Sequence, residues 1–338
     1  EAINGTPEGF TLVLPSGSYR GDLILSKGGV SVRGGGAPSF DGTKLVGGTV
    51  LKGKCQIYEH QNITLEKFGV DQSMLGNEYT DAFEFGTGIS QDRRMNIVCK
   101  DLVALGRGNA SSLHGFLAQC GTGYEFYGCK AFRFSHGFAM RAIDTIVKDC
   151  LAQDCLIDGY ITKSGDWAVT QDARQSKLIN FSGVVTSVAT RANVVVSSQT
   201  AGQTNSGVII DGVRMIGPQK VPPINIFCTA GSLTDVQIRN VYAEGFDADF
   251  GIKIEGPMDS VTIDKVALKG TMRFPISNDS QATNLSATGI TAIGTITQGW
   301  YSGAYKVLEV NGAWMMPATG LYDNPAFVLQ ESVPSSAL

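Results

Sequence analysis

Two histidines and one aspartate each begin a short segment of nearly the same pattern: an ionisable residue, a glycine, an aromatic and a strand-like run. The segments start at His114, His136 and Asp158, and a looser copy starts at Asp81. Imidazole and carboxylate groups are common general acids and bases near neutral pH. If the segments stack as neighbouring strands, these side chains form one column, spaced by about 4.8 Å. We therefore predict a catalytic site along this column, the alternative being that both histidines simply form hydrogen bonds at a corner of the fold.

Two cations occupy the same place in their segments. Arg141 and Lys163 stand five residues after His136 and Asp158, and strand alternation points both outward. Like charges on neighbouring strands repel each other unless an anion lies over them. A polymer of uronic or other acidic sugars supplies that anion, whereas a pair of solvated charges is the alternative. We include both cations in the predicted catalytic set.

The reaction type follows from the carboxylates. Glycoside hydrolysis uses two carboxyl groups about 5–5.5 Å or 6.5–9.5 Å apart, but Asp81 and Asp158 would lie roughly 14 Å apart in the column. Hydrolysis would then need Glu84, an aspartate of the following loop or a neighbouring chain beside Asp158. A lyase needs cations to neutralise a uronate and a base to take its α-proton. The residue types slightly favour a lyase over a hydrolase.

Further side chains near the column are predicted to bind substrate. A tryptophan such as Trp167, in the loop after the third segment, can stack on sugar faces, or it can instead close over the adjacent coil. The predicted substrate-binding residues are Asp81, Glu84, Tyr160, Trp167 and Arg174. Two adjacent histidines without a third ligand are a weak metal site, so we expect neither a metal nor another cofactor.

A regular pattern of apolar residues predicts the elements that carry these side chains. Inward-facing positions recur at i, i+2, i+5 and i+7, where the steps of two indicate strands and the longer step indicates a corner. Stacked units of this length indicate a β-solenoid, in which each coil buries its inner face against the next. A further repeat is expected near Leu178. The quartets begin at Ile63, Ile97, Tyr124, Thr145, Val208, Val236, Val261 and Leu285.

Short motifs at the start of the chain resemble a known superfamily. Leu12, Pro15, Gly17 and Tyr19, followed by Gly34-Gly35-Gly36, are similar to the opening of pectate-lyase-like β-helix proteins, especially bacteriophage tailspikes and depolymerases. The resemblance implies an all-β, right-handed, single-stranded parallel β-helix, for which the repeats predict about nine or ten coils. We expect N-terminal opening and capping strands over 1–54, the β-helix over 55–293, and a C-terminal cap or oligomerisation segment over 294–338.

The third segment also resembles part of the polygalacturonases. Asp158 to Gly165 is similar to their D-C-I-A-I-K-S-G segment, which carries a catalytic aspartate, and His136-Gly137-Phe138 is similar to their H-G-L. The resemblance implies catalytic roles for Asp158 and His136. Here, however, the aspartate follows the histidine, Ile157 replaces the first of the paired aspartates, and no R-I-K segment follows. The location of the site is shared, and the mechanism can differ.

Composition limits the function classes. The net charge is −4 with no run of Lys or Arg, which argues against nucleic acid as a partner. No apolar stretch approaches ~20 residues, so no membrane insertion is expected. The seven cysteines are odd in number and lack a CxxC pair, which predicts reduced core thiols and folding in a reducing cytosol.

Together these features predict a phage-tailspike-type enzyme that cleaves an acidic polysaccharide, located outside the cell or on a virion. A glycoside hydrolase acting on bacterial surface polysaccharide, a non-catalytic glycan-binding receptor protein and a purely structural spike segment are the alternatives. The resemblance and the aromatic-rich C-terminal segment also predict a homotrimer.

Overall fold

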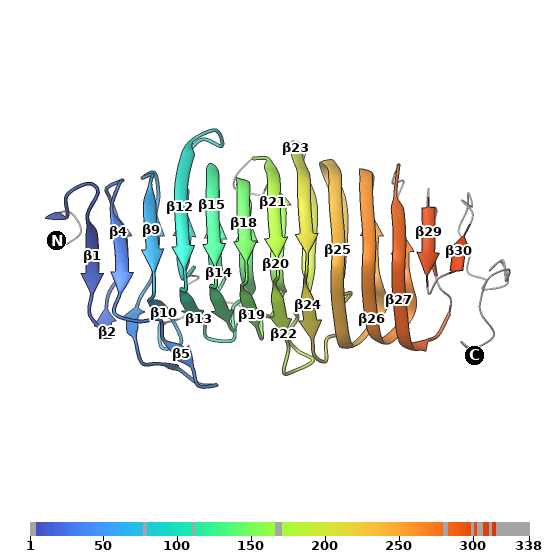
Figure 1. Ribbon diagram of the computed structural model, residues 1–338, viewed down its shortest axis with the longest axis horizontal. Coiled ribbons are helices and arrows are strands. Elements are labelled where there is room, and N and C mark those ends of the chain that lie inside the picture. Colours follow the sequence, from blue (N-terminus) through green and yellow to red (C-terminus); the bar gives the residue numbers. More distant parts are fainter. Residues whose placement is uncertain are drawn as a thin grey trace.

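The chain forms one long stack of β-strand coils. The computed structural model describes residues 5–76, 80–109, 112–165, 171–279, 283–298, 301–302, 307–310 and 313–315. Its coils follow one another along a single axis from the N-terminus to the C-terminus (Figure 1). Most strands pair in parallel with the equivalent strand of the next coil and so join one continuous sheet. The predicted parallel β-helix is confirmed.

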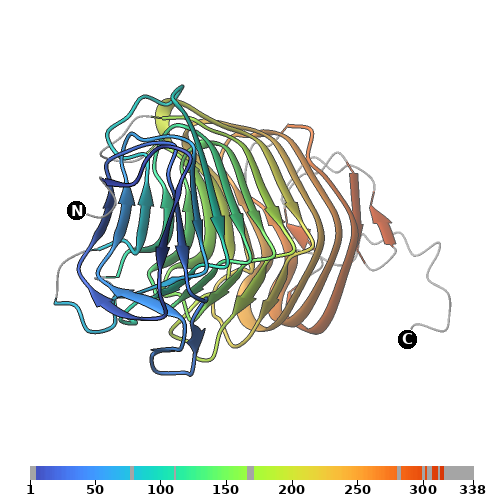
Figure 2. The same cartoon turned by 60° about the vertical axis from the view of Figure 1, so that its left-hand side comes forward.

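The strands line up on three faces of the stack (Figure 2). The first face comprises β1 (Thr11–Leu14), β4 (Ser31–Gly34), β9 (Ile63–Glu66), β12 (Arg94–Lys100), β15 (Thr122–Tyr127), β18 (Ile143–Lys148) and β21 (Ala173–Ile179). The second face comprises β2 (Gly17–Arg20), β7 (Thr49–Lys52), β10 (Gly69–Asp71), β13 (Val103–Leu105), β16 (Lys130–Phe132), β19 (Leu151–Gln153), β22 (Ser182–Val184) and β24 (Arg214–Ile216). The third face comprises β3 (Leu23–Leu25), β8 (Cys55–Ile57), β11 (Phe83–Phe85), β14 (His114–Ala118), β17 (His136–Met140) and β20 (Asp158–Ser164).

Toward the C-terminus the strands lengthen and run around the corners of the stack. These longer strands are β23 (Val194–Asp211), β25 (Ile224–Glu255), β26 (Asp259–Asn278) and β27 (Ser286–Ile296). They are followed by β28 (Tyr301–Ser302), β29 (Val307–Val310) and β30 (Ala313–Met315), and β30 pairs antiparallel with β29. Between 55 and 293 the first face holds nine described rungs, from β9 to β27, which agrees with the predicted coil number.

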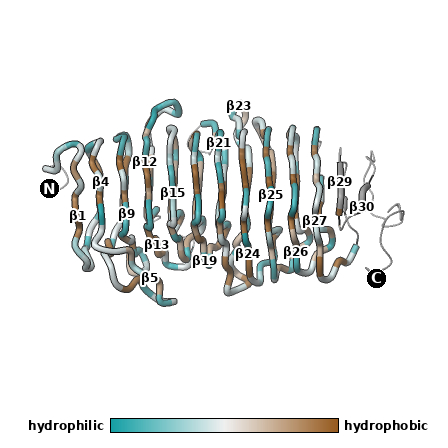
Figure 3. Tube along the Cα trace, in the orientation of Figure 1, coloured by the Kyte–Doolittle hydropathy of each residue, from teal (hydrophilic) through white to brown (hydrophobic). Residues whose placement is uncertain are grey.

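The core consists of the predicted repeat positions. Every position of the eight quartets is buried. Leu178, in β21, is buried on the remaining rung, between the quartets that begin at Thr145 and Val208. Figure 3 shows hydrophobic segments recurring on successive coils. Because each coil leaves its inner face uncovered until the next coil stacks on it, this burial is what holds neighbouring coils together.

Residues in the left-handed backbone conformation, with positive φ, explain the longer step in the repeat. Each quartet has a residue with φ between 50° and 69° at i+4, including Asp101, Asn240 and Lys265. A residue in this conformation turns the chain and interrupts strand alternation, so positions i+2 and i+5 both face inward. Asn and Asp accept this conformation more readily than most residues, and Gly accepts it without strain.

A short hairpin lies over the second face near the N-terminus. It comprises β5 (Ser39–Phe40) and β6 (Leu45–Val46), which pair antiparallel. Leu45 packs with Val50, Val103, Leu105 and Phe132 in a cluster of its own, outside the main core. The hairpin therefore covers the outer side of the second face between β7 and β16.

All seven cysteines are buried and unpaired, as predicted. Cys99, Cys129 and Cys150 occupy core positions on three successive coils, and burial raises the pKa of the Cys99 thiol well above its ordinary value. These cysteines therefore act as small core side chains. Among the described residues there is no helix of the length and apolarity needed to span a membrane.

Candidate active site on the third face

Four ionisable residues lie in register on four successive coils. The backbone pairs His114 with His136 and His136 with Asp158, and Asp81 occupies the equivalent place one coil before His114. Asp81 contacts His114, the two imidazole rings stack with centroids 4.9 Å apart, and His136 contacts Asp158. We call this set the Asp–His ladder. The predicted column exists, and Asp81 belongs to it as a direct partner of His114.

A small residue after each ladder residue, glycine in three segments and Ala82 in the first, allows the ladder side chain to point to the outer side of the sheet. A Cβ on Gly115 would lie 2.7 Å from the Ala131 Cβ, so Gly115 faces the core, as Phe116 does. Two consecutive inward residues break the strand alternation, and His114 therefore points to the outer side of the sheet, where it remains largely buried. There it meets the outward side chain of Arg141.

The interactions of His114 define its tautomer. Its Nδ1 lies 2.7 Å from Asp81 Oδ1, and its Nε2 lies 3.3 Å from Arg141 Nη2. A guanidinium group can only donate, so Nε2 accepts and Nδ1 carries the hydrogen that is donated to Asp81. His114 is only 5% exposed, and burial lowers its pKa below the ordinary value of 6.5, an effect that Asp81 opposes. His114 is thus a neutral imidazole at neutral pH, with a basic nitrogen on the outer face.

His136 forms the second half of the ladder. Its Nδ1 lies 3.0 Å and 2.9 Å from the two carboxylate oxygens of Asp158. Asp158 is 2% exposed, whereas the side chain of His136 is 18% exposed. The buried carboxylate therefore orients the more accessible imidazole.

Arg141 bridges the two ends of the neighbouring strand. Besides contacting His114, it donates from Nη1 to Gln119 Oε1 at 3.2 Å. Gln119 stands five residues after His114, the offset shared by Arg141 and Lys163. Behind them, the buried Gln171 donates from Nε2 to the backbone carbonyls of Gln119 and Arg141. Sequence reasoning missed both glutamines, although the repeat offset could have identified Gln119.

Lys163 and Glu84 extend the site in opposite directions along the stack. Lys163 is half-buried on β20, one coil beyond Arg141. Glu84 pairs with Leu117 of the His114 strand and with Gln56 of the preceding strand. Its carboxylate accepts from Gln56 Nε2 at 2.5 Å and from Thr87 Oγ1 at 2.6 Å. Glu84 is therefore held by neutral donors. Gln56 is held in turn by Tyr58, an exposed residue whose hydroxyl donates to Gln56 Oε1 at 2.8 Å.

Two predicted substrate contacts, Tyr160 and Arg174, fall outside this arrangement. Tyr160 is fully buried in the aromatic core beside Phe181, and burial raises its pKa, so its prediction as a surface substrate contact is wrong. Strand alternation at this position explains the difference. Arg174 lies on β21, on the first face, where it pairs with Asp172 rather than with a ladder residue. Trp167 lies outside the described residues.

The described side chains give no cluster suited to a metal ion. Within the described part of the chain, no group of three or more His, Cys, Asp or Glu residues is arranged to hold one. The ladder places its histidines one above the other, and each is already directed toward a carboxylate. Its arrangement instead suits proton transfer beside a cation.

Comparisons with known proteins give structural likenesses at low identity. The A-modules of two mannuronan C-5 epimerases from Azotobacter vinelandii, AlgE4 and AlgE6, match with TM-scores of 0.41 and 0.42 at 15% and 14% identity. Each match covers 89% of this chain, and 86% and 85% of the respective modules. The alginate lyase AlyF-OU02, in a complex with G6, matches with a TM-score of 0.31 at 12% identity, over 95% of this chain and 88% of the lyase. No family model and no curated protein sequence matches. At this identity the likeness concerns the fold alone.

Proposed function

We propose that this protein is a polysaccharide lyase that cleaves an acidic, uronic-acid-containing glycan by β-elimination at the Asp–His ladder. The observation that carries the proposal is the contact between Arg141 and the basic Nε2 of His114. It places a cation for the uronate carboxylate beside a neutral base for the adjacent proton. Elimination requires these two groups next to each other.

The residues divide the reaction as follows. The sugar carboxylate binds Arg141, with Lys163 one coil further along, and Arg141 moves off His114 Nε2 to meet it. His114 then takes the proton from the carbon next to the carboxylate, and Asp81 stabilises the resulting imidazolium. As the C–H bond breaks, the double bond forms and the glycosidic C–O bond breaks. His136, oriented by Asp158, serves as the general acid and donates the proton that the leaving oxygen needs.

Hydrolysis is less well supported by the same geometry. Asp81 and Asp158 are three strand spacings apart, roughly 14 Å, which exceeds the separation of hydrolase carboxyl pairs. Each faces a histidine, and Glu84 is held by Gln56 and Thr87. The carboxylates therefore orient imidazoles and polar side chains and do not face one another.

We further propose that the substrate is a bacterial surface glycan and that the protein acts outside the cell or on a virion as a homotrimer, in the manner of a tailspike. The N-terminal motifs that resemble tailspikes support this context. Mass measurement by light scattering at micromolar concentration tests the assembly. A monomer would contradict the proposed trimer without affecting the proposed chemistry.

The proposed activity is tested with a panel of capsular and uronic polysaccharides, each with a neutral glucan as control. We expect shortening of an acidic polymer together with ultraviolet absorbance from the new C=C bond. New reducing ends without that absorbance would instead establish a hydrolase. Binding without shortening would establish a receptor protein, and either result would overturn the lyase.

A further inference from the structure

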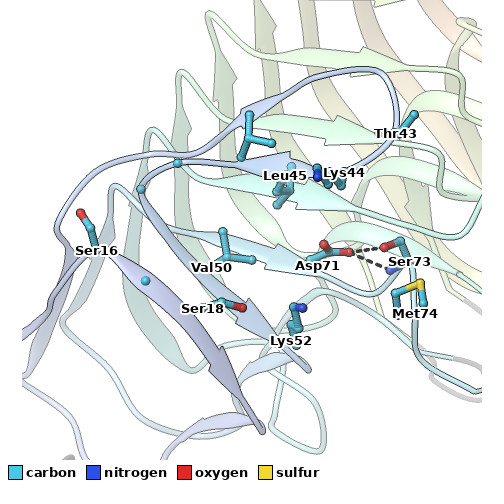
Figure 4. A pocket seen from close by; sticks show the side chains of 14 residues that line it. Ser16, Ser18, Thr43, Lys44, Leu45, Val50, Lys52, Asp71, Ser73 and Met74 are labelled. Carbon is cyan, nitrogen blue, oxygen red and sulfur yellow. Dashed lines mark hydrogen bonds between the residues drawn. The ribbon is translucent and has the colours of Figure 1, made fainter.

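A cavity lies on the second face of the stack, away from the ladder. It is bounded by the β5–β6 hairpin on one side and by β2, β7 and β10 of the second face on the other, and its volume is about 810 Å³ (Figure 4). Gly47 and Gly48 form part of its rim, and a side chain at Gly47 would meet no atom within 4 Å. The glycine therefore leaves the cavity open where the hairpin returns to the sheet.

Cations are concentrated around this cavity. Lys44, on the hairpin connection, and Lys52, on β7, both line it. Arg20 pairs in register with Lys52 on the neighbouring strand. None of the three forms an ion pair within the part of the chain that the structure describes. Adjacent like charges are unfavourable without a counter-ion, so the cavity is suited to an anionic group.

Two aspartates lie near these cations, and both have local partners. Asp71, which lines the cavity, accepts from the Ser73 backbone N–H and hydroxyl at 2.9 Å and 2.6 Å, both at Oδ1. Asp71 is 8% exposed, at the wall of the cavity. Asp41 accepts backbone hydrogen bonds from Lys44 and Thr43 in the turn of the hairpin, which lower its pKa to about 2. Asp41 thus fixes the turn that carries Lys44.

The remaining lining residues suit a sugar. Leu45, Val50 and Met74 provide apolar surface, and Met74 is 87% exposed. Ser16 and Ser18 add hydroxyl groups to the lining. A ligand with an anionic group, several hydroxyls and an apolar ring face satisfies all of these features. An acidic monosaccharide unit has this combination.

The cavity and the ladder are linked by one buried side chain. Gln72 directly follows Asp71, which lines the cavity. The fully buried Gln72 donates from Nε2 to the backbone carbonyl of Asp81 at 2.8 Å and accepts from Thr80 at 3.0 Å. This corner joins the wall of the cavity to the first residue of the ladder.

We infer that the cavity between the hairpin and β7 is a second binding site for an acidic saccharide, which holds a distal part of the polymer that the ladder cleaves. The identity of the polymer rests on the proposed function, whereas the anionic ligand rests on the cavity itself. Lys44, Lys52 and Arg20 bind the carboxylate, Asp71 accepts a ring hydroxyl, and Met74 contacts the face of the sugar.

The experiment measures binding at the cavity without using catalysis. A short oligomer of galacturonic acid is titrated into full-length His136→Ala protein, and the backbone amide resonances of Gly47, Gly48 and Ser73 are followed by NMR. We expect saturable shifts of these resonances, and no shifts with a neutral maltose oligomer. Lys44→Gln combined with Lys52→Gln should weaken binding at these amides about tenfold or more, because two charge-assisted contacts are lost.

Lys100→Gln is the matched control, since Lys100 is an exposed lysine on the first face. It should bind the oligomer as the parent protein does. Absence of shifts, equal shifts with the neutral oligomer, or unchanged binding by the double variant would each overturn the second site. If no polymer in the panel is cleaved but the shifts behave as expected, the lyase proposal fails and the binding site stands.

Discussion

Gly137 offers a direct test of how the ladder is built. It precedes the core residue Phe138 and faces inward, which is why His136 reaches the outer surface. A Cβ at this position would lie 2.5 Å from the Gly159 carbonyl oxygen and 2.7 Å from the Ala152 Cβ. Ordinary contacts between carbon atoms are about 3.5–4.0 Å. Neither neighbour can yield easily, because one is backbone of the next coil and the other is a core methyl group.

The size of the effect follows from two opposing terms. Overpacking a core costs about 1–3 kcal/mol, and the backbone clash places Gly137→Ala at the upper end. Replacing Gly by Ala also lowers the conformational entropy of the unfolded chain, which stabilises the folded protein by about 0.4–1 kcal/mol. We expect a net loss of about 2 kcal/mol in the free energy of unfolding. Gly159→Ala should lose less stability, because its Cβ would lie 3.1 Å from the Ala192 carbonyl oxygen and 3.4 Å from the Ala152 Cβ, which is a milder overlap than at Gly137.

Chemical denaturation followed by circular dichroism measures the difference. Gly36→Ala is the control, since its nearest neighbour would lie at 3.6 Å, an ordinary contact. We expect the order of stability to be Gly36→Ala, then Gly159→Ala, then Gly137→Ala. A Gly137→Ala variant as stable as the parent protein would refute the reasoning, because the coils could not then approach as closely as described.

Three further predictions concern the ladder and its cations. His136→Ala should lower turnover of the acidic polymer about 10²–10⁴-fold, with a loss of about 0.5–3 kcal/mol in the free energy of unfolding. The control is Lys253→Ala, on the same face but several coils away, which should leave turnover unchanged. Full activity of His136→Ala would exclude a catalytic role. Arg141→Ala and Lys163→Ala should each raise KM for the acidic polymer, and the defect should diminish at high salt because screening weakens long-range attraction; a salt-independent defect would argue against charge recognition. Because the pKa of His114 in the folded protein lies below 6.5, the unfolded chain binds more protons in that window, so the free energy of unfolding should fall as the pH decreases below about 6.5. His114→Asn should reduce this pH dependence in denaturation measurements, and an unchanged dependence would show that other groups cause it.

The inner surface of the fold could be predicted almost completely from the sequence. Strand alternation and the repeated corner identify residues such as Ile97 and Val236 as core, and both are fully buried. The prediction succeeds because each coil repeats the same local structure: two inward-facing residues, a residue with positive φ that turns the chain, and two more inward-facing residues. The hairpin over the second face lacks a repeat, and its cluster around Leu45 depends on contacts between coils that are distant in sequence. No local sequence pattern predicts such contacts.

The candidate site could be predicted in its membership but not in its orientation. His114 and Phe116 have the same strand parity, so simple alternation predicts that both face inward. The intervening Gly115 breaks that alternation, since a Cβ there would meet Ala131 and the backbone of Gly137. The histidine is thereby turned outward to the side that carries Arg141. The glycine of the repeated segment therefore has a functional consequence: without it, the base and the cation of the proposed elimination would lie on opposite sides of the sheet.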